Sequence, residues 1–315
     1  MPLRGARQAL TEPVRCSRCS LTELFGFPLP LLLGQLMLGL VNGAFYAMLS
    51  LGLAVIFGLM DVVNFAHGAF FMMGAMFAWM GGQYFHLGFW SMLWIAPLLV
   101  GVTGVLVERL MLRRLRGMDP IYGLLLTFGL TLLIEGVFRS FFGVAGAPYN
   151  PPDLLGGTMN LGFMFLPVYL AFAVAASLVV CFGTWLLIDR TKLGAYLRAG
   201  TENPALVQAF GINFPLLVML TFGFGSALAG LAGVLAAPVI QVSPLMGSNL
   251  IIVVFAIVVI GGMGSVMGSI VTGLSLGMIE GLAKVLYAPI STTVVFIFMA
   301  LVLTVRPAGL FGKDK

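Results

Sequence analysis

The chain has 315 residues, of which 60% are hydrophobic and 9% are charged, whereas a soluble domain is about 45–50% apolar and about 25% charged. This composition excludes an ordinary soluble domain and indicates a protein that lies mostly in a membrane. The formal net charge of +5 does not indicate a nucleic-acid partner, because the basic residues fall in short segments between long apolar runs, as in membrane proteins.

Residues 1–28 precede the first long apolar run and carry four arginines, Arg4, Arg7, Arg15 and Arg18. No small-residue cleavage site lies at a convincing distance, so we expect an uncleaved cytosolic extension, with a cleaved signal peptide as the alternative. Cys16 and Cys19 form a single CxxC pair, which is a weak metal signal without a second pair, and no metal site is predicted.

Apolar runs follow along the rest of the chain, at about 29–60, 65–83, 90–107, 120–142, 162–188, 215–240, 249–263, 266–287 and 289–305. A spanning helix needs roughly 20 apolar residues, and in lipid only helices or closed barrels satisfy every backbone N–H and C=O group. We therefore predict an all-α, polytopic transmembrane helical bundle over residues 29–307, with about 8–10 spans and broken or re-entrant helices. The first run is longer than an ordinary span, and Gly39, Asn42 and Gly43 are expected to interrupt it.

The basic residues form four clusters: the N-terminal tail, 109–116, 190–198, and Arg306 with Lys313 and Lys315. The positive-inside rule places these clusters in the cytosol, so both termini are expected there, with residues 308–315 as a C-terminal tail. The loop at 144–161 carries one acid and no base and is expected to be periplasmic. Three apolar runs precede Arg109 and would put the N-terminal tail outside, so an even number of spans is required there, which the interruption of the first run would supply.

The segment Asp61–Gly68 places polar side chains between two apolar runs, where such groups are costly. One interpretation is a helix break in which Asn64 caps a half-helix that begins near Phe65, whose positive end would stabilise a passing carboxylate. The alternative is a tight turn at the membrane surface that Asp61, Asn64 and His67 satisfy. The candidate residues of a translocation path are Asn42, Asn64, His67 and Gly68.

Residues 189–214 contain a short helix between two strong end signals. Asn203 and Pro204 form an N-cap and first turn, and Gly211 supplies a left-handed C-terminal position. A helix of about seven residues is unstable alone, and its apolar side chains, Leu206, Val207 and Phe210, favour docking into a groove on another protein. A helix that lies on lipid headgroups or on its own bundle is the alternative.

The glycine-rich segment 261–268 contains no lysine and no phosphate-binding loop pattern. We interpret Gly261, Gly262 and Gly264 as a hinge or tight turn in which glycine permits positive φ and close backbone approach. ATP is therefore not expected to bind this chain through a P-loop. Two further pairs, Glu135 with Arg139 and Glu280 with Lys284, have the i, i+4 spacing of helical ion pairs.

These motifs together resemble the permease subunits of branched-chain amino-acid ABC importers, in particular the H-type subunit of the leucine, isoleucine and valine system. The resemblance rests on ordered segments at 43–52, 63–68, 194–213, 262–265 and 307–312 and covers about residues 31 to 312. It implies a bacterial inner-membrane protein that works by alternating access. The implied partners are a second related permease, two cytosolic ATPase subunits that carry ATP and Mg, a periplasmic substrate-binding protein and membrane lipid, with no cofactor on this chain.

The resemblance also gives the short helix a role as the element that couples the permease to an ATPase. The residues involved are Gly194, Arg198, Glu202, Asn203, Pro204, Leu206, Val207, Phe210 and Gly211. An importer of the same family for urea or short amides remains an alternative, as does a proton-coupled secondary carrier of small polar solutes. A membrane-embedded enzyme ranks last, because the chain has two histidines and neither lies near a serine and aspartate in sequence.

Overall fold

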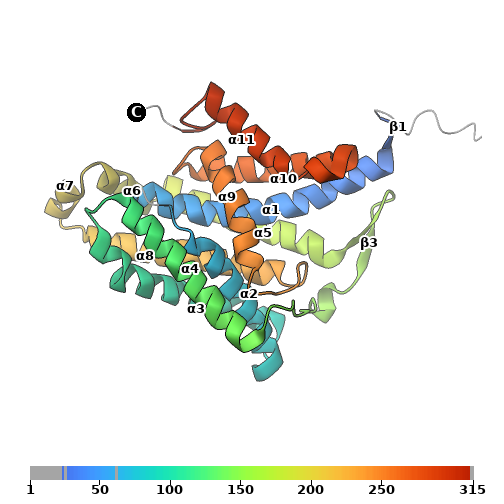
Figure 1. The fold of residues 1–315 in the computed structure, drawn as a ribbon, viewed down its shortest axis with the longest axis horizontal. Coiled ribbons are helices and arrows are strands. Elements are labelled where there is room, and N and C mark those ends of the chain that lie inside the picture. Colours follow the sequence, from blue (N-terminus) through green and yellow to red (C-terminus); the bar gives the residue numbers. More distant parts are fainter. Residues whose placement is uncertain (1–22, 25–26, 61–62, 313–315) are drawn as a thin grey trace, which may run out of the picture.

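A computed structural model describes residues 23–24, 27–60 and 63–312. Most of the predicted N-terminal extension, including Cys16 and Cys19, and also Asp61, lie outside the described residues. The helices are α1 (Leu29–Met60), α2 (Ala66–Phe85), α3 (Phe89–Leu110), α4 (Pro120–Phe142), α5 (Val168–Arg190), α6 (Lys192–Glu202), α7 (Pro204–Ala209), α8 (Phe214–Ala236), α9 (Met246–Gly261), α10 (Val266–Tyr287) and α11 (Thr293–Val305). The predicted helical class is confirmed (Figure 1).

Two short antiparallel hairpins lie outside the helices. One pairs β1 (Glu23–Leu24) with β2 (Phe27–Pro28), and the other pairs β3 (Thr158–Asn160) with β4 (Phe165–Pro167). The second hairpin belongs to the loop between α4 and α5. Neither hairpin was expected from the sequence.

Six helices of the described chain are long and apolar enough to cross a membrane, namely α1, α3, α4, α5, α8 and α10. Helices α9 and α11 are apolar but shorter, with 16 and 13 residues. The predicted total of about 8–10 spans counted the first run as two, so with α1 unbroken ten is not reached; how many of α2, α9 and α11 also cross the bilayer stays a prediction.

Helix α1 runs without a break through all 32 of its residues, so the predicted interruption at Gly39, Asn42 and Gly43 is wrong. Its glycines instead let α10 approach closely. A Cβ on Gly39 would lie 2.6 Å from the carbonyl oxygen of Gly277, and one on Gly43 would lie 2.9 Å from that of Leu274. In lipid, helix association depends on such close packing of small residues. These glycines therefore serve the contact between α1 and α10 and do not interrupt α1.

The two ends of α1 lie at opposite ends of the bundle. At its start, the position of a Cβ on Gly34 is 3.8 Å from Met164 Sδ in the β3–β4 hairpin. At its end, Met60 packs against the cluster of Val207 and Phe214. Figure 1 shows β3 near the start of α1, with α6 and α7 on the far side. The positive-inside prediction that put the N-terminal tail and residues 189–214 on one side required an even number of crossings before Arg109, which the predicted interruption of α1 supplied and an unbroken α1 does not.

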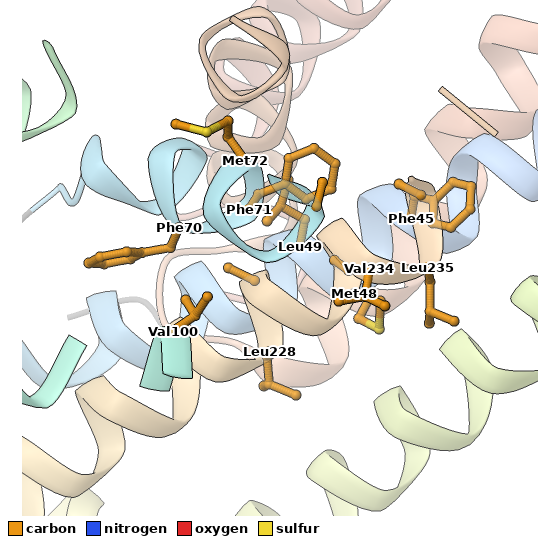
Figure 2. Close-up of a cluster of buried hydrophobic side chains, with 14 of the residues drawn as sticks. Phe45, Met48, Leu49, Phe70, Phe71, Met72, Val100, Leu228, Val234 and Leu235 are labelled. Carbon is orange, nitrogen blue, oxygen red and sulfur yellow. The ribbon is translucent and has the colours of Figure 1, made fainter. Parts of the chain in front are cut away.

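The core lies where α1, α2, α3 and α8 meet. Figure 2 shows Leu49 of α1, Phe70 and Phe71 of α2, Val100 of α3 and Leu228 of α8 in this region, and all five are buried in one cluster. The rings of Phe70 and Phe222 pack edge to face at 6.2 Å, a geometry that aromatic pairs favour. This centre holds the N-terminal half of α2 against its neighbours.

The turn between α9 and α10 is closed by the end of the chain. Gly262 and Gly264 have φ values of 98° and 83°, which confirms the predicted use of positive φ, whereas Gly261 is the last residue of α9. The amides of Leu310 and Phe311 donate hydrogen bonds to the carbonyls of Ile260 and Gly261, at 2.8 and 3.2 Å. Motion at this turn, the hinge role, stays a prediction.

Candidate functional site

The predicted helix break is present between α1 and α2, since α1 ends at Met60 and α2 begins at Ala66. The predicted capping role of Asn64 is wrong. Phe65 occupies the cap position, no side chain caps the helix, and neither amide atom of Asn64 has a hydrogen-bond partner among the described residues. Asn64 is nevertheless 2% exposed. A buried amide without partners costs about 1–3 kcal/mol, which marks the residue as a point where a further group could bind.

His67 and Gly68, in the first turn of α2, hold that turn against two other helices. The Nε2 atom of His67 lies 3.0 Å from the carbonyl oxygen of Leu49 on α1, so this nitrogen carries the proton and donates. His67 is fully buried, and its Nδ1 atom has no partner in the described chain. A Cβ on Gly68 would lie 2.7 Å from the carbonyl oxygen of Gly247 in the first turn of α9, so glycine is needed for this contact.

Asn42 does not join this group. It lies on α1 seven residues before Leu49, the contact of His67, which is about 10 Å along a helix axis. Its side chain is half-buried between the glycines that pack on α10. The structure therefore brings together three of the four predicted path residues.

Helix α4 turns a polar face toward this break. Its buried residues recur at every fourth position and are Gly123, Thr127, Thr131 and Glu135. This spacing keeps side chains on one face of a helix. The Thr127 hydroxyl lies 3.3 Å from both the carbonyl oxygen of Val63 and the amide of Phe65, so it ties α4 to the break between α1 and α2. Thr131 donates to the carbonyl of Thr127 at 2.8 Å.

The predicted ion pair between Glu135 and Arg139 is wrong. Arg139 is exposed and no ion pair joins the two, whereas Glu135 is 7% exposed and accepts a hydrogen bond from Ser248 in the first turn of α9. The parallel prediction for Glu280 and Lys284 is confirmed, with Nζ 2.8 Å from Oε1. The first turns of α2 and α9 and the buried face of α4 thus meet in one junction.

A cleft of about 190 Å³ lies at the end of the bundle that carries α7. It is lined by the end of α1, the connection between α3 and α4, and the start of α8, including Met60, Gly123 and Phe214. Arg116, also on its wall, pairs with the buried Glu108. Because Gly123 is the first member of the buried face of α4, that face leads from the junction to this cleft.

Helix α7 forms as the sequence indicates. The Asn203 side chain accepts a hydrogen bond from the amide of Leu206 at 3.0 Å, Pro204 follows in the first turn, and Gly211 has φ of 80°. These three end signals are confirmed. Their agreement explains how six residues hold a helical shape at the end of the bundle.

Of the three apolar side chains predicted to dock on another protein, the structure buries one and exposes two. Val207 is 4% exposed and packs with Phe214 and Val218 of α8, so it anchors α7 to its own chain. Leu206 and Phe210 are 55% and 77% exposed. They form the outward apolar tip of α7.

Helix α6 folds back against the end of α5. Gly194 is buried against the carbonyl of Ile188, where a side chain would have no room. Arg198 lies 3.8 Å from Asp189, with both side chains more than half exposed, so this pair contributes little. Glu202 is exposed at the end of α6, beside the cap of α7.

The polar residues of α4 and Ser248 were missed from the sequence. The signal was the spacing of Thr127, Thr131 and Glu135 at four-residue intervals in an apolar helix, which periodicity can detect. Ser248 gave no comparable signal, because its partner is 113 residues away along the chain.

Known proteins resemble the chain over nearly its whole length. The family described as "Branched-chain amino acid transport system / permease component" matches residues 35–305. The permease protein BraD of Pseudomonas aeruginosa, from a high-affinity branched-chain amino acid transport system, is 29% identical over 90% of this chain and 96% of its own. The corresponding protein LivH of Escherichia coli is 26% identical over the same shares.

A second Escherichia coli permease protein of a high-affinity branched-chain amino acid transport system, LivM, is 28% identical over 86% of this chain and 68% of its own length. No solved structure matches the chain. The family match spans both the helix break and the α6–α7 segment, so the whole site described above falls within it. This chain belongs to the permease components of branched-chain amino acid transport systems.

Proposed function

We propose that this permease moves branched-chain or related small amino acids into the cytoplasm as the membrane-spanning subunit of an ATP-driven importer. The observation that carries the proposal is the tip of α7. Leu206 on α7 and Phe210, the residue that caps its C-terminal end, are exposed apolar side chains, and Val207 anchors the helix to the bundle. An apolar tip on a rigid base is suited to a hydrophobic groove on an ATPase subunit.

The remaining parts of the assembly follow from the same proposal. ATP and Mg bind two cytosolic ATPase subunits, and this chain carries no cofactor of its own. The likeness to both LivH and LivM of one bacterium supports pairing with a second, related permease. A periplasmic binding protein delivers the substrate, and the names of BraD and LivH support branched-chain amino acids as that substrate.

The orientation in the inner membrane follows from the basic residues near α6. The positive-inside rule places residues 189–214 in the cytosol, and the C-terminal segment lies on that side because it pairs with Ile260 and Gly261. The turn between α9 and α10, to which this C-terminal segment is bonded, also contacts the end of α1, where Gly58 meets Gly264. The start of α1 then faces the periplasm, a revision of the cytosolic N-terminus expected from the sequence.

The packing provides a route from α7 to the helix break. Val207 touches Phe214 and Val218 of α8, and Met60 at the end of α1 packs on the same cluster. When ATP brings the ATPase subunits together, a displacement of α7 moves the start of α8 and the end of α1. The break beyond Met60 is where α2 can reorient, so the path past Asn64, His67 and Gly68 opens to one side at a time.

The test uses the full importer reconstituted in proteoliposomes with its ATPase, partner permease and binding protein. Replacing both Leu206 and Phe210 by serine removes the apolar tip and leaves the Val207 anchor. We expect the ATPase to be lost from the purified complex and ATP-driven leucine uptake to fall at least tenfold. Gln208→Ala, an exposed change on the same helix, should leave both within twofold. Unchanged ATPase recovery and uptake in the double variant would refute the proposed docking.

A further inference from the structure

Glu135 is a buried carboxylate with no ion-pair partner among the described residues. It is 7% exposed on a span whose other buried residues are Gly123, Thr127 and Thr131. Among the described residues, no lysine, arginine or histidine lies within ion-pair distance of it. In the part of the chain that the structure describes, the other two buried glutamates differ, since Glu108 pairs with Arg116 and Glu280 with Lys284.

Its local contacts neutralise only part of a negative charge. Ser248 donates one hydrogen bond, and this serine lies in the first turn of α9. A helix N-terminus carries roughly half a positive charge. An ionised carboxylate at membrane depth ordinarily has a full counter-charge, and neither the Ser248 hydroxyl nor a helix N-terminus supplies one.

We propose that Glu135 and Ser248 bind the ammonium group of the amino-acid substrate, on the side of the membrane from which it enters. This rests on the proposed function. Glu135 lies in the half of α4 nearest the β3–β4 loop, away from the cleft beside Gly123. A substrate that comes from the binding protein therefore meets Glu135 before it reaches the helix break.

The geometry separates this site from Asn64. Thr127, which contacts the residues on both sides of Asn64, lies eight residues from Glu135, about 12 Å along α4. A small amino acid holds its ammonium and carboxylate groups within a few ångströms of each other and cannot reach both. Glu135 and Asn64 are therefore successive positions on one path, joined by the hydroxyls of Thr127 and Thr131.

The proposal also bears on the class of substrate. Urea and short amides can donate hydrogen bonds to a carboxylate but bring no charge to balance it. An amino acid brings a full positive charge, and a charge-assisted hydrogen bond is roughly twice as strong as a neutral one. Glu135 thus favours amino acids over the neutral substrates that related importers could carry.

The decisive variant is Glu135→Gln, which keeps the shape of the side chain and its ability to accept the hydrogen bond from Ser248 but removes the charge. It is measured in the reconstituted complex as ATP-driven uptake of radiolabelled leucine, after co-purification shows that the subunits assemble. We expect a loss of at least tenfold in kcat/KM. Asp153→Asn, which removes an exposed acid in the loop on the same side, should stay within twofold and exclude a general effect of charge.

Ser248→Ala removes the hydrogen bond and keeps the charge, so its loss should be clearly smaller than that of Glu135→Gln. Equal losses in the two variants, or uptake by assembled Glu135→Gln within twofold of the wild type, would overturn the proposal. If Glu135→Gln does not assemble, Glu135→Asp provides the test. Aspartate keeps the carboxylate but is shorter by one methylene group, so we expect the KM for leucine to rise at least threefold. An unchanged KM would also overturn the proposal.

The failure of the proposed function would look different. A wild-type complex that shows no ATP-dependent leucine uptake would refute the importer itself, before any variant is compared. Normal wild-type uptake with an unaffected Glu135→Gln complex would refute the ammonium site alone.

Discussion

The seam between α1 and α10 allows a prediction in which the same substitution has opposite effects at two positions. A Cβ on Gly273 of α10 would lie 2.7 Å from both the backbone nitrogen and the Cα of Ala47 on α1. Ordinary contact begins at 3.4 Å, so the two helices would have to separate by about 0.7 Å. Neither obstructing atom can rotate away, because both belong to the backbone of α1.

The magnitude follows from two opposing contributions. Overpacking of this kind costs about 1–3 kcal/mol, and a gap of 0.5–1 Å already forfeits a quarter to a half of a dispersion contact. Replacing glycine by alanine inside a helix stabilises that helix by about 1 kcal/mol. We therefore expect Gly273→Ala to lower stability by about 1 kcal/mol, and Gly273→Leu to lower it further because its added carbons meet the same backbone.

The matched control is Gly129→Ala on α4, where a Cβ would meet no atom within 4 Å. Here the helix preference acts alone, and stability should rise by up to about 1 kcal/mol. The assay is the temperature at which the purified chain in detergent loses half of its monodisperse size-exclusion peak. About 1 kcal/mol corresponds to roughly 2 °C for a chain of this size. A Gly273→Ala protein as heat-resistant as the wild type would refute the close packing inferred for this seam.

Three further predictions test the ends and charges of the bundle. Asn203→Ala should cost about 1 kcal/mol of helix stability and reduce ATPase recovery in co-purification, whereas Asn203→Asp keeps the cap and should retain it. Lys284→Met removes the cationic partner of the buried Glu280, which keeps only the hydrogen bond from Tyr46. The change should cost roughly 1–3 kcal/mol, since Lys284 is 37% exposed and its pair is partly screened; Lys284→Arg should restore the loss in the same heating assay. An epitope inserted before Leu29 should be accessible to antibody in intact spheroplasts, and one after Gly312 only after permeabilisation; the reverse pattern would contradict the orientation proposed above.

The sequence was informative where structure depends on neighbours along the chain. Asn203 and Gly211 mark the ends of α7 through local backbone geometry, and the structure confirms both. Glu280 and Lys284 pair because they are one helical turn apart, and the Tyr46 hydroxyl occupies the other carboxylate oxygen of Glu280. The helix break after Met60 was likewise visible, as polar residues between two apolar runs.

The sequence was less informative where a contact joins distant segments. Gly39 and Gly43 resemble a helix interruption, yet their role depends on α10, more than 200 residues later. Glu135 was assigned to Arg139 by spacing, but Arg139 points to the outside of the bundle and Ser248 of α9 takes its place. The spacing of the polar residues of α4 could have revealed its polar face, but which distant segments that face contacts depends on packing that the sequence does not show.

The pairing of the chain end with the turn after α9 has a consequence for biogenesis. The amides of Leu310 and Phe311 reach back to Ile260 and Gly261, about 50 residues earlier in synthesis. While the ribosome still holds residues 310 and 311, those two carbonyls have not met their donors and the turn is not closed. This corner of the permease therefore matures only once residues 310 and 311 have been made and released, and a nascent chain that stops before residue 310 leaves it open to quality-control proteases.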